Sequence, residues 1–79
     1  MILEISKYRD NNIKTLEMFI KNKCDYWHEK RIIAEFAVAT NVPIVAVCYL
    51  YKELKGTNSE LDEYTNKLIQ FYKYEEILL

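Results

Sequence analysis

The stretch that most constrains the fold of this chain is residues 36–54, where a turn signal lies between two runs of apolar residues at helical spacing. Asn41 stands where a short turn between helices needs a positive φ, which Asn adopts at lower cost than other non-glycine residues. Pro43 suits the first turn of a helix, because its missing N–H has no partner to lose there. The stretch therefore predicts a helix, a turn at residues 40–42, and a second helix over residues 43–54.

Two further helices are predicted before the turn, because apolar residues recur at helical spacing. The first follows three good N-cap residues, 10–12, and covers residues 12–23. The second is capped by Asp25 and covers residues 26–39. Residues 1–9 are interpreted as an N-terminal arm or a short strand. Small residues that let another helix approach closely stand along the second helix at Ala34, Ala37 and Ala39.

A long C-terminal helix is predicted at residues 59–78. Gly56 marks the end of the preceding helix, and Ser59 with Asp62 resembles a capping box. The sequence therefore predicts an all-α fold in a single domain, residues 1–79. This domain has four helices, a helix-turn-helix-like core and a long last helix.

The charge balance argues against a dedicated nucleic-acid-binding protein. With 11 basic and 12 acidic residues, the formal net charge is −1, whereas such proteins are usually clearly basic. The chain also carries seven tyrosines, and Tyr combines a large apolar ring with a polar tip. That combination suits contact surfaces as well as the edges of a core.

The sequence carries no recognisable signal for catalysis, for a metal or for a cofactor, so we predict a non-enzyme without cofactors. His28 is the only histidine and is interpreted as a structural residue. A single glycine excludes the usual glycine-rich phosphate loop. Cys24 and Cys48 match no metal-ligand spacing and are typical of free thiols in a reducing cytosol. Neither a signal peptide nor an apolar run of bilayer length is present, which predicts a cytoplasmic protein.

Residues 36–54 resemble the helix-turn-helix of bacterial repressors, most closely the DNA-binding end of the tetracycline-repressor family. In that family a small residue on the first helix packs against the second. A turn residue, an apolar residue and a helix-opening Ser or Pro follow. The matching positions here, with the inward apolar positions of the second helix, are Ala37, Asn41, Val42, Pro43, Val47, Leu50 and Tyr51. The resemblance implies a second helix that lies in the major groove of DNA.

The outward side of that second helix is mostly apolar. With Val47, Leu50 and Leu54 facing the core, the outward residues are Pro43, Ile44, Val45, Cys48, Tyr49 and Lys52. Base edges are read by side chains with hydrogen-bonding groups, and an apolar ridge offers few of them. Such a ridge favours a protein partner instead. The predicted partner-binding residues are Ile44, Val45, Cys48, Tyr49 and Lys52.

Two functions from different classes follow. The first is a small regulatory protein that acts by binding another protein, through this ridge or through the Tyr-rich last helix. Its composition, rich in Lys, Asn, Ile and Tyr, resembles accessory proteins of mobile elements, such as phage-encoded inhibitors. The alternative is a small DNA-binding transcriptional regulator that forms a homodimer. Its phosphate contacts would be Lys30, Arg31, Lys52 and Lys55.

Overall fold

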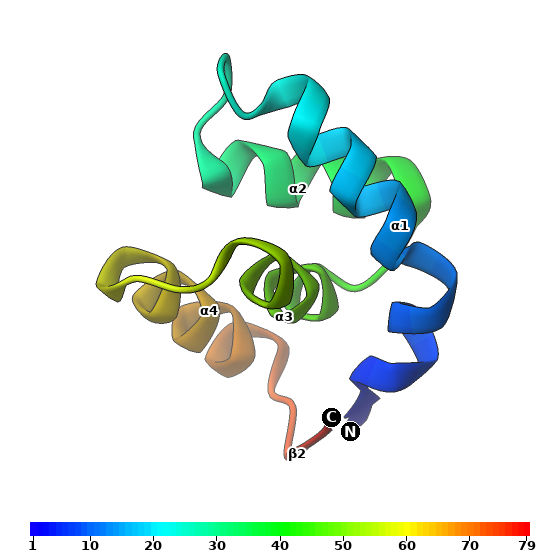
Figure 1. Ribbon diagram of the computed structural model, residues 1–79. Coiled ribbons are helices and arrows are strands. Elements are labelled where there is room, and N and C mark those ends of the chain that lie inside the picture. Colours follow the sequence, from blue (N-terminus) through cyan, green and yellow to red (C-terminus); the bar gives the residue numbers. More distant parts are fainter.

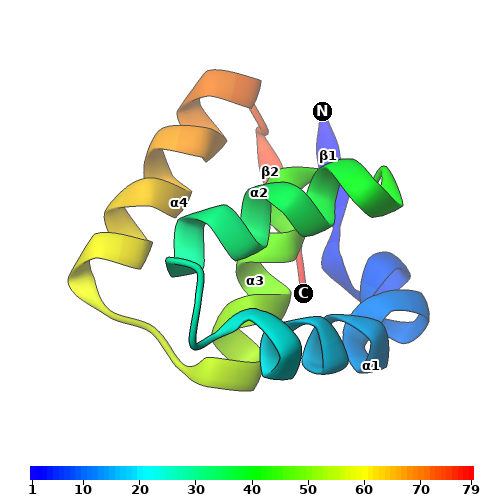
Figure 2. The same ribbon diagram turned by 90° about the horizontal axis from the view of Figure 1, so that it is seen from above.

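A computed structural model describes the whole chain, residues 1–79, and confirms the small four-helix domain. In chain order the elements are β1 Ile2–Glu4, α1 Ile5–Lys23, α2 Glu29–Thr40, α3 Ile44–Lys55, α4 Ser59–Tyr72 and β2 Glu76–Leu78. Both ribbon views place α3 in the middle, with α1, α2 and α4 around it (Figure 1, Figure 2). The central helix is therefore the second helix of the predicted helix-turn-helix.

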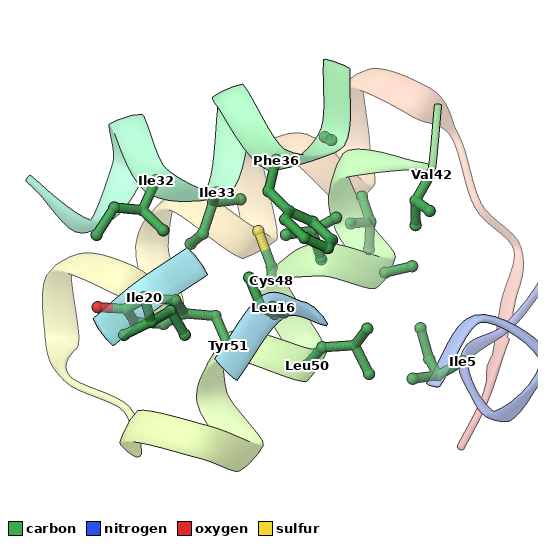
Figure 3. Close-up of a cluster of buried hydrophobic side chains, with 14 of the residues drawn as sticks. Ile5, Leu16, Ile20, Ile32, Ile33, Phe36, Val42, Cys48, Leu50 and Tyr51 are labelled. Carbon is green, nitrogen blue, oxygen red and sulfur yellow. The ribbon is translucent and has the colours of Figure 1, made fainter. Parts of the chain in front are cut away.

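The core is built around α3, which is buried on almost every side. Its buried residues are Val45, Ala46, Val47, Cys48, Leu50 and Tyr51. Side chains from α1 and α2 pack against them, among them Leu16, Ile33 and Phe36 (Figure 3). Full burial of one Val, Leu or Phe side chain contributes about 1.5–3 kcal/mol relative to exposure, so this helix holds much of the stability of the fold.

The turn between α2 and α3 forms as the sequence predicts. Asn41 takes the left-handed conformation with φ 57°, and its N–H donates to the carbonyl oxygen of Ala37. The N–H of Val42 donates to the same carbonyl at 3.2 Å. Pro43 has φ −53° and is the N-cap residue, so α3 begins at Ile44. Asn41 therefore ends α2 and changes the direction of the chain so that α3 can begin.

The first helix begins at Ile5, seven residues before the predicted start, so the prediction of N-caps at residues 10–12 is wrong. Asn12 lies inside α1, and its side-chain amide donates to the carbonyl oxygen of Tyr8 at 2.7 Å. Ile5 is buried and Tyr8 packs against the core. Because this packing requires a helical backbone, it outweighs the local preference of Asp and Asn for helix ends.

Two other predicted caps are displaced. The cap of α2 is His28 rather than Asp25, because the N–H of Lys30 donates to His28 Nδ1 at 3.1 Å. The cap of α4 is Asn58 rather than Ser59, because the N–H of Leu61 donates to Asn58 Oδ1 at 2.8 Å. Both helices exist, but α2 begins at Glu29 rather than at residue 26, whereas α4 begins at Ser59 as predicted.

The last helix is shorter than predicted, since α4 ends at Tyr72 rather than at residue 78. Lys73 takes the left-handed conformation with φ 54° and turns the chain away. β2 then pairs in parallel with β1, with Leu3 opposite Ile77. Leu3 is buried and Ile77 packs against the core, so the pairing seals one end of it. Of the two predictions for residues 1–9, the short strand is confirmed for Ile2–Glu4, and the rest of that segment is helix.

Candidate functional site

The predicted apolar ridge on α3 is not a surface, so this part of the prediction is wrong. Val45 and Cys48 are 0% exposed, whereas Ile44, Tyr49 and Lys52 are half-buried. The reason is that α4 lies beside α3 (Figure 2), and its Thr65 hydrogen-bonds the thiol of Cys48, one of the residues expected to face outward. Burial also raises the pKa of the Cys48 thiol to about 11, partly offset by a hydrogen bond with Thr65 of α4.

The four predicted phosphate contacts do not form one basic surface. Lys30 lies 3.1 Å from a carboxylate oxygen of Glu60, and Lys52 lies 3.0 Å from Asp62. Lys55 is exposed and makes no ion pair. The Arg31 guanidinium makes no ion pair either and lies over the ring of Trp27. Two of the four cations are therefore already neutralised within the fold.

Both acidic partners have lowered pKa values. A hydrogen bond from Lys30 is the largest cause of the lowered pKa of Glu60. For Asp62 the largest cause of the lowered pKa is a hydrogen bond from the Thr57 hydroxyl, followed by one from Lys52. These two ion pairs join the start of α4 to α2 and α3.

A largely apolar groove lies between the C-terminal half of α2 and the end of α4, with a volume of about 510 Å³. Seven of its nine lining residues are hydrophobic, so water in it makes few hydrogen bonds. The lining residues are Ala34, Ala37, Val38, Asn41, Val42, Pro43, Ile44, Tyr72 and Tyr74. Ile44, one of the predicted partner-binding residues, therefore lines this groove instead of an exposed ridge.

The groove opens because α2 and α4 diverge along their length. Their N-terminal ends lie close together, joined by the Lys30–Glu60 ion pair. The Asn58 amide of the α4 cap also donates to the carboxylate of Glu29 at 3.2 and 3.3 Å. From there the helices separate toward their C-terminal ends, as Figure 1 and Figure 2 both show. The small side chain of Ala34 leaves further room on the α2 wall.

Large apolar side chains stand exposed around the groove. Val38 is 82% exposed and Phe71 is 76% exposed, and Tyr72 is also exposed. The ring of Tyr72 lies 5.1 Å from that of Phe71 and 6.4 Å from that of Tyr74. Tyr72 and Tyr74 line the groove together with Val38, and the Phe71 ring adjoins that of Tyr72; we call these three rings the aromatic wall. Such a gathering of apolar side chains is typical of an interaction surface.

The groove also has polar groups at its margin. A tyrosine hydroxyl is protonated at neutral pH and can donate a hydrogen bond, and burial raises the pKa of the Tyr74 hydroxyl further. Asn41 also lines the groove, and its exposed side-chain amide makes no hydrogen bond within the chain. An apolar floor with a few polar groups at the rim is the usual composition of a binding site.

The sequence offered only partial signals for this groove. The small residues Ala34 and Ala37 and the Tyr-rich last helix both contribute to it. The exposure of Val38 could not be predicted from the sequence, because nothing in the local pattern distinguishes it from a core residue. Val38 and Tyr72 are far apart along the chain, and only the fold brings their elements to one groove.

One cluster has the side chains of a metal site, at His28, Glu29 and Glu60, whose ligand atoms lie within 4.8 Å of one another. Its contacts favour a structural role. Because His28 Nδ1 accepts from the Lys30 N–H, the neutral ring carries its proton on Nε2, the atom 3.6 Å from Glu60. The ammonium group of Lys30 also lies on Glu60. We interpret the cluster as a helix cap and an ion-pair network.

None of the four helices has both the length and the apolar composition needed to cross a bilayer. Comparisons with models of protein families, with curated proteins and with solved structures found no match to this chain.

Proposed function

We propose that this protein is a non-enzymatic binding protein that takes apolar side chains of a protein partner into the groove between α2 and α4. The observation that carries the proposal is the groove itself, largely apolar and lined by exposed Val38 and Tyr72, with exposed Phe71 beside Tyr72. Covering these side chains removes apolar surface from water, at about 25 cal/mol per Å². That gain is the main source of affinity for a partner here.

The extent of the apolar surface favours a protein segment over a small molecule. A volume of about 510 Å³ lies within the range of small-molecule pockets. The exposed ring of Phe71, however, extends the apolar surface beyond the groove lining. A partner that covers both is larger than a metabolite, and aromatic residues are enriched where proteins bind each other.

The DNA-binding alternative has less support. A recognition helix must present one face to the major groove, but on α3 the expected outward residues Val45 and Cys48 are fully buried, and Cys48 bonds Thr65 of α4. Lys30 and Lys52 are engaged in ion pairs within the chain. The backbone geometry at Asn41 is the observation that favours this alternative. The resemblance to the tetracycline-repressor motif stays a prediction.

Two further parts of the proposal concern what binding does to the partner and where the protein originates. We expect the bound protein to be one whose activity this chain regulates, and an origin in a mobile element or phage follows from composition alone. A second copy of the chain is the other protein partner to be tested, since exposed Val38 and Phe71 offer apolar surface that another copy can cover.

Selection from a display library of short random peptides tests the proposal. Peptides are selected on the wild-type protein and their affinities measured for Val38→Glu and for Met18→Glu. Val38 and Met18 are both exposed apolar residues on helices, at 82% and 65%, but Met18 lies on α1 away from the groove. We expect Val38→Glu to weaken binding about tenfold or more, because it places a charge at the apolar contact.

The control variant Met18→Glu is expected to bind like the wild type. Both substitutions are on the surface, so thermal unfolding should be nearly unchanged in each. If the selected peptides bind Val38→Glu as tightly as the wild type, the groove is not the binding surface.

A further inference from the structure

Two cations of this chain lie over one aromatic ring beside α2. The Lys23 ammonium is 4.8 Å and the Arg31 guanidinium 4.2 Å from the centroid of the Trp27 ring. Trp27 is held in place by an edge contact with Phe19 at 6.0 Å, and Phe19 in turn lies 5.6 Å from buried Phe36. The two charges are therefore positioned on a rigid platform that is anchored in the core.

Neither cation of this Trp27 platform makes an ion pair. Most of the other arrangements that hold a basic side chain in place include a carboxylate, as for Arg9 with Glu53. Arg31 has Glu35 one helical turn away, but no ion pair joins them. Two positive charges held on an aromatic ring without a counter-charge are suited to an external anion.

Arg31, the one residue of the platform that belongs to α2, lies on the same stripe of that helix as two residues of the groove. Arg31, Ala34 and Val38 are spaced at i, i+3 and i+7, which places them on the same face of a helix. Seven residues correspond to about 10 Å along the helix axis. A single extended or helical segment lying along α2 would therefore reach both the platform and the groove.

We propose that the Trp27 platform binds a carboxylate of the same protein segment whose apolar side chains enter the groove. This inference rests on the proposed function and adds the class of partner. The partner segment is acidic and amphipathic, with an Asp or Glu about two helical turns from its apolar contact residues. Arg31 supplies a planar pair of donors to the carboxylate, and Lys23 adds a second charge.

A carboxylate fits the platform better than a nucleic acid does. Two cations already lie over the Trp27 ring, so the ring is not free to stack on a base. The chain as a whole has a net charge of −1, which opposes the approach of a polyanion with many phosphates. A short acidic segment needs only the two positive charges of Lys23 and Arg31, so the net charge of the chain matters less for it.

The peptides selected from the random library provide the test. We expect Asp and Glu to be enriched in them over the starting library. Replacement of that acid by Gln in the tightest peptide should weaken binding about three- to tenfold, and the effect should shrink in high salt. The same change should have a smaller effect on binding to Arg31→Gln or Lys23→Gln, because each variant lacks one of the two charges that face the carboxylate.

Lys14→Gln is the matched control, since Lys14 is an exposed lysine of α1 without an ion pair. Replacement of the acidic residue of the peptide by Gln should weaken binding to this variant as much as it weakens binding to the wild type. Peptides that depend on Val38 but show no acidic preference would overturn this inference and leave the proposed function standing. Peptides that do not depend on Val38 would remove the proposed function itself.

A second probe separates the two classes of anion. A fluorescent random single-stranded oligonucleotide is titrated at low salt into the wild type and into Arg31→Gln. We expect no binding that depends on Arg31. Binding that is lost in Arg31→Gln, without an acidic preference among the peptides, would make the platform a nucleic-acid contact and contradict the inference.

Discussion

At the scale of single residues, the burial of Val45 and Cys48 shows that α3 is a core helix and not an exposed binding helix. Both were expected to face outward, because Val47 and Leu50 face inward and one helix commonly buries one face. Both are fully buried instead, since α3 is covered from more than one side. The pattern of apolar residues on α3 is consistent with either a one-sided or an all-round burial.

Substitution of these residues by Asp separates core from surface. Val45→Asp places an unpaired carboxylate at a fully buried position. We expect this change to lower the free energy of unfolding by about 3–5 kcal/mol. Ile44→Asp, at the margin of the groove, should cost about 1–2 kcal/mol because its carboxylate remains partly hydrated. Urea unfolding followed by circular dichroism measures both. Equal effects would mean that the two positions are equally buried.

The Cys48 thiol gives a prediction about pH. Burial raises its pKa from 9.0 to about 11, so the neutral thiol is favoured in the folded state. The associated stability is fully present below the pKa of the unfolded state. It is lost as the pH rises from 9.0 toward 11, because the unfolded chain ionises first.

Cys48→Ala removes this contribution, so the variant should lose less stability than the wild type over that pH interval. Urea unfolding of both proteins at a series of pH values provides the comparison. A constant difference between them across the interval would show that the Cys48 thiol ionises equally easily in the folded and unfolded states.

At the scale of elements, the capping residues account for where α2 and α4 begin. Asn58 accepts from the Leu61 N–H and donates to Glu29, so one side chain both starts α4 and joins it to α2. Ser59, the predicted cap, makes no side-chain hydrogen bond. Local composition identified the loop correctly, but three consecutive polar residues all suit a cap, and only contacts with α2 distinguish them.

We therefore expect Asn58→Ala to lower the free energy of unfolding by about 1 kcal/mol, the usual effect of losing a cap. Ser59→Ala is the matched control and should change it by less than about 0.5 kcal/mol. Thermal or urea unfolding of the two variants gives the answer. A larger effect at Ser59 than at Asn58 would contradict the assigned cap.

Much of the secondary structure could be predicted from local patterns. The turn at Asn41 and the start of α3 were predicted because backbone preference and apolar spacing agree there. The start of α1 and the end of α4 were not, because their ends are set by distant contacts. Leu3 and Ile77 form a strand pair, and neither three-residue segment carries enough signal to identify its partner.

At the scale of the whole molecule, the candidate site arises from the arrangement of helices rather than from a motif. α2 and α4 both pack on α3, are fastened together at their N-terminal ends and separate toward the groove. Ile44 was identified from the sequence and lines this groove, although for a different reason from the one expected. The aromatic wall and Val38 could not be assigned, because no local pattern indicates which apolar residues a fold leaves exposed.

Chemical-shift mapping by NMR tests the central claim most directly. The tightest selected peptide is titrated into the ¹⁵N-labelled protein, and the amide signals that shift are assigned. The account predicts the largest changes at Ala34, Val38 and Tyr72, with little change at Met18 on α1. Large changes confined to α1 or to the strand pair, with the signals of Val38 and Tyr72 unmoved, would show that the partner binds elsewhere.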